Sequence, residues 1–430
     1  MAGGWEALAD ARPNGGDAET VTPVGALIVV SCYTRHDELA HEPRGRQAAF
    51  SLYTYQLDAA DGSLTLLSVT KCDDNLAFTR FHPELNIFYS CTESLKENGK
   101  VVTFELDRRD GKITRLGHQD AGGTSTCYLT LAMDRRFLLL VNYWSSSVTT
   151  LPVDPDSGAL GALCASYHPK GEAARQTVHV QAGKHSKHSN NDGATQRERQ
   201  LDPHTHAIVL DPLYGCIAYV PDLGMDVIHE LYFDRQSGSL SKIGDIPVGV
   251  AGKCHGPRYI EFHPRLPVCY VINEISSIVA VFRVEKEAIA QIERNGGAVE
   301  PAPYHSLSPL QSISTIPAAF DPALNTCGRI TVHPSGRFVV VSNRGHNSLT
   351  VFRIKEKSSG RLELLGWTHT RGETPRHFQF TGTGDWLIVA NQDSDSLVTF
   401  SFSPSSGRLK HSGLVMCPSP NFVACCPHTD

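Results

Sequence analysis

The sequence of 430 residues predicts an all-β fold, a seven-bladed β-propeller whose first blade is completed by the C-terminal strand. Three observations support this prediction. A unit of short apolar strands recurs along the chain, its copies are spaced by about fifty residues, and the two ends carry complementary strands. A propeller arranges such units around a central channel and leaves only short strand edges exposed.

The repeated unit contains an apolar strand, a tight turn with Pro or Gly, a second apolar strand and a polar loop, followed by a third and a fourth strand. Five segments show its first half: FTRFHPELNIFYSCTES from residue 78, IVLDPLYGCIAYVPDLG from 208, YIEFHPRLPVCYVINEIS from 259, ITVHPSGRFVVVSNRGH from 330 and FQFTGTGDWLIVANQDS from 378. The turns of the units fall at positions 83, 133, 212, 264, 334, 382 and 427. Seven turns predict seven blades.

The spacing of the units also predicts where extra residues are inserted. Successive turns are separated by 50, 79, 52, 70, 48 and 45 residues, so two intervals clearly exceed the period. We expect insertions near 169–200 and 286–322, each between a fourth strand and the next first strand, where both would overhang one face of the ring. We expect a single propeller domain over residues 25–430, preceded by a disordered segment at 1–24.

The two ends of the chain predict how the ring closes. The first strand, ALIVVSCYT, resembles the second strand of a unit, and the next two strands resemble the third and the fourth. The missing first strand is found at the other end, as PNFVACCP. We therefore expect the C-terminal strand to complete the first blade and to close the ring without a covalent link.

Composition excludes several classes of function. The formal net charge of −6 gives no electrostatic basis for binding nucleic acid or an anionic membrane, and no apolar run is long enough to cross a bilayer. The N-terminus lacks the basic and apolar parts of a secretory signal. The twelve cysteines are scattered without CxxC pairs, which favours buried thiols in a reducing compartment. We expect a cytoplasmic protein, and composition does not indicate its oligomeric state.

Polar side chains converge on one mouth of the predicted channel. Because strands alternate in direction, loops that enter first strands and loops that leave second strands open on the same face. These positions hold His204, His206, Arg258, Arg329, Arg376, Asp222, Asn273, Glu274, Asn343, Arg344, Asn391 and Gln392, and the first insertion ends there with Arg199 and Gln200. Loops held on a rigid scaffold commonly carry binding and catalytic residues, so we expect the functional site at this mouth.

Several of these residues also have structural interpretations. A histidine before a strand, such as His204, is often a turn or capping residue. Arg258 and Arg376 both follow Pro at the same blade position, where they could tie neighbouring blades together. His185 and His188 have no carboxylate or thiol alongside, which favours a solvated loop over a metal site. The histidines of the recurring HP turns are expected to be structural, and we expect neither a metal nor another cofactor.

The repeats carry motifs that resemble those of a known family. RQLDPHTH, YVPDLGMD, GPRYIEFHP, VINEISS, VVVSNRGHNSLTVF, TPRHFQF and WLIVANQDSDSLVTF, in this order, resemble the seven-bladed β-propeller lactonase family over residues 25–427. That family includes propeller-type 6-phosphogluconolactonases and fungal 3-carboxy-cis,cis-muconate lactonising enzymes. The resemblance implies metal-free lactone chemistry: hydrolysis of 6-phospho-glucono-1,5-lactone to 6-phosphogluconate in the pentose phosphate pathway, or lactone formation from a muconate.

The resemblance also implies a catalytic set, namely His206, Arg258, Glu274 and Arg344. One position departs from the family, because Arg329 stands where many members have an acidic residue. We expect a small anionic lactone as substrate, since guanidinium groups match phosphate and carboxylate oxygens. Glu274 and His206 are the candidate bases for hydrolysis. The residues expected to bind substrate are His204, Arg199, Gln200, Arg376, Asn273, Asn343, Asn391 and Gln392.

Two other functions are compatible with the same residues. A muconate cycloisomerase would use the arginines for carboxylates and would need a proton donor in place of a base that activates water. A non-catalytic propeller would bind a ligand or a protein on its rim, for which the aromatic pair Tyr143 and Trp144 is suited. The remaining rim consists mainly of Arg, His, Glu and Asn, which favours a small anionic ligand.

Overall fold

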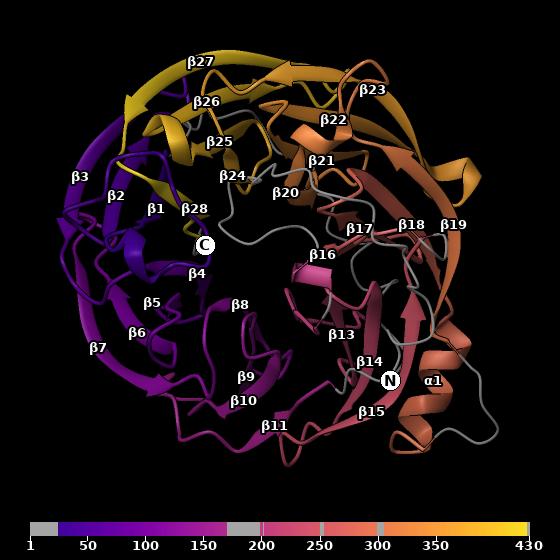
Figure 1. The fold of residues 1–430 in the computed structure, drawn as a ribbon. Coiled ribbons are helices and arrows are strands. Elements are labelled where there is room, and N and C mark those ends of the chain that lie inside the picture. Colours follow the sequence, from indigo (N-terminus) through magenta and orange to yellow (C-terminus); the bar gives the residue numbers. More distant parts are fainter. Residues whose placement is uncertain (1–24, 170–197, 201, 250–252, 299–304, 428–430) are drawn as a thin grey trace, which may run out of the picture.

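The computed structural model describes residues 25–427, except 170–197, 201, 250–252 and 299–304. The described chain forms seven four-stranded antiparallel sheets, arranged as the blades of a propeller (Figure 1). The predicted seven-bladed fold is therefore confirmed. The N-terminal segment 1–24, for which we expected disorder, lies outside the described residues.

Each blade is named here from the central channel outward. Blade 1 contains β28 (Pro420–Cys425), β1 (Ala26–Cys32), β2 (Leu52–Leu57) and β3 (Leu64–Thr70). Blade 2 contains β4 (Leu76–Phe81), β5 (Ile87–Thr92), β6 (Lys100–Leu106) and β7 (Ile113–Asp120). Blade 3 contains β8 (Thr126–Leu131), β9 (Phe137–Asn142), β10 (Ser147–Pro152) and β11 (Ala165–Tyr167). Blade 4 contains β12 (Val209–Leu210), β13 (Ile217–Asp222), β14 (Val227–Phe233) and β15 (Leu240–Pro247).

The remaining blades follow the same order. Blade 5 contains β16 (Pro257–Phe262), β17 (Val268–Asn273), β18 (Ile278–Val284) and β19 (Leu307–Ser314). Blade 6 contains β20 (Thr326–Val332), β21 (Phe338–Arg344), β22 (Ser348–Lys355) and β23 (Arg361–His369). Blade 7 contains β24 (Pro375–Phe380), β25 (Trp386–Asn391), β26 (Ser396–Phe402) and β27 (Leu409–Met416). The helices of the described residues are α1 (Lys286–Arg294) and the short 3-10 turns η1 (His36–Glu38), η3 (Glu198–Gln200), η4 (Pro322–Leu324), η5 (Glu356–Ser358) and η6 (Gln392–Ser394).

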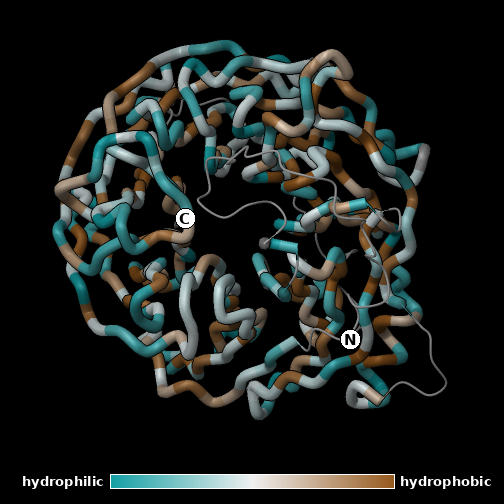
Figure 2. The backbone as a smooth tube through the Cα atoms, viewed as in Figure 1, coloured by the Kyte–Doolittle hydropathy of each residue, from teal (hydrophilic) through white to brown (hydrophobic). Residues whose placement is uncertain are grey.

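The hydrophobic core lies between neighbouring blades, so it is distributed around the ring. The second strands are almost entirely buried, as in β5 and β9, because both faces of these strands pack against adjacent blades. The outer strands alternate between half-buried and exposed residues, as in β7, because one face meets solvent. Figure 2 shows the corresponding hydrophobic stretches recurring around the whole ring. Within the described residues, no helix has the length and apolarity needed to span a bilayer.

The C-terminal strand closes the ring as the sequence predicted. β28 pairs antiparallel with β1, with Ile28 opposite Cys425 and Ser31 opposite Phe422. The ring of Phe422 also stacks on His377 of blade 7, with a centroid distance of 3.8 Å. The last strand of the chain therefore joins the first blade to the last one.

The HP turns have the structural role expected of them. In blade 5, Nδ1 of His263 accepts hydrogen bonds from the backbone N–H groups of Arg265 and Leu266, at 2.9 Å and 2.8 Å. Nε2 of the same ring donates to the carbonyl oxygen of Gly336 in blade 6, at 2.8 Å. Each such histidine closes its own turn and can also hold the next blade.

One of the two predicted insertions is placed differently from the expectation. The segment 169–200 does lie between a fourth strand, β11, and the next first strand, although 170–197 are outside the described residues. The expectation for 286–322 was wrong, because its extra residues lie between the third strand β18 and the fourth strand β19. Since strands alternate in direction, this connection opens on the face opposite the predicted site. There Ile289 and Ile292 of α1 pack into the core of blades 4 and 5.

Candidate active site

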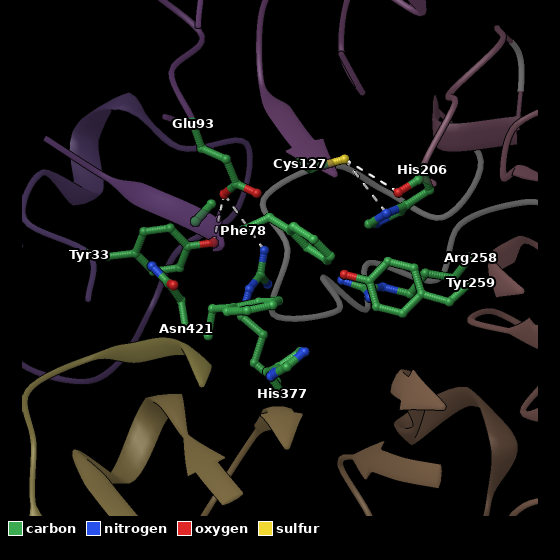
Figure 3. A pocket seen from close by; sticks show the side chains of 12 residues that line it. Tyr33, Phe78, Glu93, Cys127, His206, Arg258, Tyr259, His377 and Asn421 are labelled. Atoms are coloured by element: carbon green, nitrogen blue, oxygen red, sulfur yellow. Dashed lines mark hydrogen bonds and ion pairs between the residues drawn. The ribbon is translucent and has the colours of Figure 1, made fainter. Parts of the chain in front are cut away.

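A pocket opens where the sequence placed the channel mouth, and a further space continues from it into the channel. The mouth is lined by Ala40, His41, Glu93, Ser125, Cys127, Tyr143, Trp144, Arg199, His206, Arg258, Glu274, Arg344 and Arg376. The deeper part, drawn in Figure 3, shares Glu93, Cys127, His206, Arg258 and Arg376 with it. Four guanidinium groups and two carboxylates give the mouth two net positive charges when its histidines are neutral, although the whole chain is acidic.

Two recurring features of the blades direct these side chains into the pocket. The first is a shift of register in the innermost strand, at Cys127 in β8, at Arg258 in β16 and at Arg376 in β24. A β-bulge re-aims the side chain of its extra residue. The second is the position at the end of the second strand, where Glu274 follows the last residue of β17 and Glu93 follows the last residue of β5.

Glu274 is the centre of the most highly charged part of the pocket. Its Oε2 lies 2.8 Å from Nε of Arg258 and 3.0 Å from Nη2 of Arg344, and its Oε1 accepts a hydrogen bond from Nη2 of Arg199. Burial raises the pKa of this carboxyl, but Arg199, Arg344 and Arg258 together hold the pKa well below its usual range. Glu274 therefore stays ionised and anchors three guanidinium groups, which makes it a poor proton acceptor.

His206 is the second central residue, and its environment keeps it neutral. Nε2 of the ring lies 4.0 Å from Oε2 of Glu274, and Nδ1 lies 3.7 Å from Sγ of Cys127. Burial, followed by the positive charge of Arg258, lowers the pKa of His206 well below the ordinary histidine value, despite the opposing effect of Glu274. A neutral imidazole beside a fixed carboxylate can accept a proton from water at neutral pH.

His204 is placed beside the pocket, where it supports the aromatic wall. Its ring stacks on Tyr143 with a centroid distance of 4.8 Å, and its Nδ1 lies 3.2 Å from the Tyr143 carbonyl oxygen. Its backbone N–H donates to Oδ1 of Asp222 at 2.8 Å. Of the two candidate histidines, His206 is the one that lines the pocket.

The end of the first insertion supplies one pocket residue and one anchor. Arg199 enters the pocket, where its Nε donates to the hydroxyl of Tyr143 at 3.0 Å and its Nη2 reaches Glu274. The neighbouring Gln200 points elsewhere, since its amide donates to the carbonyl oxygen of Leu223. The insertion thus contributes a guanidinium group that completes the cluster around Glu274.

The asparagines at or next to the ends of second strands do not lie where we expected them. Asn343 donates to Oγ1 of Thr350 at 2.8 Å, Asn391 to the carbonyl oxygen of Thr370 at 3.1 Å, and Asn273 to backbone oxygens of its own blade. All three are fully buried inside their blades, and they are not among the described residues that line the pocket. The residues that follow Asn273 and Asn343, namely Glu274 and Arg344, do line the pocket.

Gln392 occupies an intermediate place. Its Oε1 lies 3.4 Å from Nε2 of His41, which does line the pocket, while its amide nitrogen donates to Oδ1 of Asp393 at 3.1 Å. It therefore supports the wall formed by His41.

Arg329 lies deeper in the channel, with its Nη2 3.8 Å from Oε2 of Glu261 and its guanidinium 5.4 Å from the ring centroid of Tyr259.

Glu93 is the pocket carboxylate that the sequence analysis missed. Its Oε2 accepts a hydrogen bond from the hydroxyl of Tyr33 at 2.6 Å and lies 3.7 Å from Nη2 of Arg376. In Figure 3, Glu93 and Tyr33 lie on one side of the pocket, and His206 and Arg258 on the other. The repeats did carry the signal, because Glu93 in SCTES and Glu274 in INEIS both directly follow the last residue of a second strand.

Within the described residues, no group of three or more His, Cys, Asp or Glu side chains has the arrangement needed to hold a metal ion. His185 and His188, for which we expected a solvated loop, lie outside the described part of the chain.

The fold and the pocket together define a seven-bladed propeller with a buried, positively charged site at one mouth of its channel. Residues 28–425 match the family described as "Lactonase, 7-bladed beta-propeller", and the chain belongs to this family.

Individual relatives cover most of the chain. It is 31% identical over 359 residues to a 6-phosphogluconolactonase of Bacillus subtilis, across 83% of this chain and 89% of that protein. It is 27% identical over 369 residues to a 6-phosphogluconolactonase of Formosa agariphila, across 84% and 90% of the two chains. The structure of a periplasmic gluconolactonase of Pseudomonas aeruginosa matches with a TM-score of 0.74 and 24% identity, across 94% of this chain and 99% of that one. At this identity the last likeness concerns the fold alone.

Proposed function

We propose that the protein hydrolyses a sugar lactone, 6-phospho-glucono-1,5-lactone, to 6-phosphogluconate without a metal. The observation that carries this proposal is the position of His206, a neutral imidazole whose Nε2 lies 4.0 Å from Oε2 of Glu274, in a pocket of net positive charge. Family membership and the two relatives named 6-phosphogluconolactonase support the same reaction. Carboxylate and phosphate groups are the anions that clustered guanidinium groups bind best.

The proposed reaction begins with a water molecule beside His206. The neutral imidazole takes a proton from the water while its oxygen attacks the lactone carbonyl carbon. The negative charge that develops on the carbonyl oxygen is stabilised by a guanidinium group, for which Arg344 and Arg258 are the nearest candidates. When the tetrahedral intermediate collapses, the bond from the carbonyl carbon to the ring oxygen breaks, and the proton on His206 passes to that oxygen.

The other residues have positioning roles in this proposal. Glu274 holds Arg199, Arg258 and Arg344 in fixed orientations, so that the guanidinium groups are already oriented when substrate binds.

We assign the reaction to the pentose phosphate pathway in the cytoplasm. All twelve cysteines are free thiols, which supports a reducing compartment.

The test is hydrolysis of freshly generated 6-phospho-glucono-1,5-lactone, followed as acid release at mildly acidic pH, where spontaneous opening is slower. Purified protein is compared with His206→Gln and with the surface variant Glu97→Gln as the control. We expect the His206 variant to lose activity by roughly a hundredfold to ten-thousandfold, the usual contribution of general base catalysis, while the control keeps it.

Equal rates for protein and buffer would exclude this function. Cyclisation of 3-carboxy-cis,cis-muconate and binding of a protein at the rim would then be measured, the latter because Trp144 is 40% exposed beside the pocket.

A further inference from the structure

The two carboxylates of the pocket occupy equivalent backbone positions but have different partners. Both follow the last residue of a second strand, Glu93 in blade 2 and Glu274 in blade 5. Glu274 is held by three guanidinium groups. Glu93 has one hydroxyl donor at normal hydrogen-bond distance and one guanidinium nitrogen at 3.7 Å. Equivalent positions therefore present one carboxylate with charged donors on both oxygens and one whose Oε1 has no donor among the described residues.

The free capacity of Glu93 is located on one oxygen. The contacts with Tyr33 and Arg376 both involve Oε2, and no hydrogen bond or ion pair within the described residues reaches Oε1. Glu93 lines both the mouth of the pocket and the deeper space. A carboxylate oxygen can accept two hydrogen bonds, so Oε1 is available to donors of a ligand that enters from the mouth.

The surroundings hold Glu93 in this orientation. Tyr33 is fully buried, and its ring lies under the guanidinium group of Arg376 at 5.3 Å from ring centroid to Cζ. The backbone N–H of Glu93 donates to the carbonyl oxygen of Asn75 at 2.9 Å, which ties the loop to the preceding strand connection. A ligand therefore meets an acceptor whose backbone and side chain are both already positioned.

The chemistry of this position favours hydroxyl groups over a second anion. A carboxylate accepts hydrogen bonds from the hydroxyls of a polyol, and it repels the carboxylate of a polyanionic substrate. The cluster around Glu274 supplies the positive charge for a single anionic group on the other side of the pocket. The pocket is thus complementary to a molecule with an anionic group and several hydroxyls.

We propose that Glu93 is a specificity-determining residue, which accepts hydrogen bonds from the ring hydroxyls of the substrate and so selects polyhydroxylated lactones. This inference rests on the proposed lactone hydrolysis and defines its substrate class. It distinguishes sugar lactones from unsubstituted lactones, which offer no hydroxyl donors, and from carboxylated muconates, whose charge Glu93 would oppose.

The test compares two lactones with the same six-membered ring. Glucono-1,5-lactone carries ring hydroxyls and δ-valerolactone carries none, and both are given to wild type, to Glu93→Gln and to Glu97→Gln. The control residue lies four positions along the same loop and is exposed, where it pairs with Lys100. We expect Glu93→Gln to lower kcat/KM for the gluconolactone by roughly tenfold to a hundredfold, mainly through KM, as for loss of charged hydrogen bonds.

The result for δ-valerolactone decides between specificity and a structural role. We expect its kcat/KM to change by less than about twofold in Glu93→Gln, because no substrate hydroxyl is involved. Equal losses for both lactones, or no loss for either, would overturn the assignment of Glu93. The Glu97→Gln variant should match wild type with both.

A binding measurement separates this inference from the proposed function. If wild type hydrolyses no lactone faster than buffer does, the proposed function fails, and titration calorimetry with 6-phosphogluconate and with inorganic phosphate still tests Glu93. A variant that loses affinity for 6-phosphogluconate but keeps it for phosphate supports hydroxyl recognition. Equal affinities of wild type and variant for 6-phosphogluconate, or no binding by either, would contradict it.

Discussion

The Glu274 and Glu93 sides of the pocket start from the same blade position and differ in the number of charged neighbours. In blade 5 the bulge residue Arg258 lies beside Glu274, and Arg199 and Arg344 arrive from other parts of the chain. In blade 2 the neighbours of Glu93 are an aromatic hydroxyl and one more distant arginine. A repeated backbone thus delivers the same side chain to the pocket, and its neighbours decide whether it fixes cations or accepts hydrogen bonds.

Removing the closing strand should have the largest effect on this arrangement, because the Glu93 side rests on it. Ser31 donates to Oδ1 of Asn421 at 2.6 Å, and Asn421 donates to the carbonyl oxygen of Leu76 at 2.8 Å, so β28 links blades 1 and 2. Deletion of residues 421–430 is expected to abolish the cooperative thermal transition or to lower Tm by more than about 10 °C, measured by circular dichroism. Deletion of 428–430 alone keeps β28 and serves as the control. Similar thermal transitions for the two deletion variants would refute the closure of the ring by β28.

Glu274→Gln should destabilise the Glu274 side of the pocket, because it removes the negative charge that three arginines share. The variant leaves Arg199, Arg258 and Arg344 buried without their shared carboxylate, and loss of one partner from a buried ion pair costs about 3–5 kcal/mol. We expect the free energy of unfolding, measured in urea, to fall by this amount. Lactonase activity should also fall, by more than in Glu93→Gln. If Glu274→Gln and Glu93→Gln destabilise the protein equally, the contrast between the two carboxylates is wrong.

His229 tests the support of the segment that carries His204, because Asp222 contacts both residues. Burial lowers the pKa of this histidine, but hydrogen bonds to Asp222 and Asp245, at 3.2 Å and 2.6 Å, raise it overall to about 9. Because the folded pKa exceeds the ordinary value of about 6.5, the stabilisation is complete below pH 6.5 and is lost as pH rises through 9.

The corresponding variant is His229→Gln. Wild type should be more stable than it by roughly 3 kcal/mol at most near pH 6.5, since each pKa unit is worth about 1.4 kcal/mol. The difference should shrink by pH 10, as followed by urea unfolding across this range. A difference that is independent of pH would show that the ring contributes through packing alone.

The pH dependence of activity gives the smallest expected effect, which is an acid limb of kcat/KM shifted to lower pH. Catalysis in our proposal requires neutral His206, whose pKa is well below the ordinary value. kcat/KM, corrected for spontaneous hydrolysis, should therefore remain level from pH 8 down to pH 6.5 and fall only at lower pH. An acid limb centred at or above pH 6.5 would contradict the assignment of His206 as base.

Repeat periodicity was enough to predict the propeller and the mouth of the channel at which the pocket lies. Four residues implied by family resemblance, His206, Arg258, Glu274 and Arg344, all line the pocket. The helical insertion was misplaced because a period anchored on turns records how many residues are added, but not the strands between which they lie. The spacing of Ala288, Ile289 and Ile292 carried the missing signal, an apolar face at helical spacing.

Side-chain direction was harder to predict than position along the chain. Asn273 and Asn343 sit one residue before side chains that reach the pocket, yet they point into their blades. Successive residues of a strand face opposite sides, so a shift of one position separates a structural amide from a pocket residue. Glu93 was missed for the related reason that its importance depends on neighbours from other blades.

Local strand and turn patterns repeat along the chain, so the number of blades, the closure by the C-terminal strand and the face that carries the polar residues could all be predicted from them. The three arginines around Glu274, the neutral His206 and the open oxygen of Glu93 could be recognised only in the folded molecule. These properties arise from distances and burial among residues brought together from different blades, and the energy of a buried charge depends on such neighbours far more than on its local sequence.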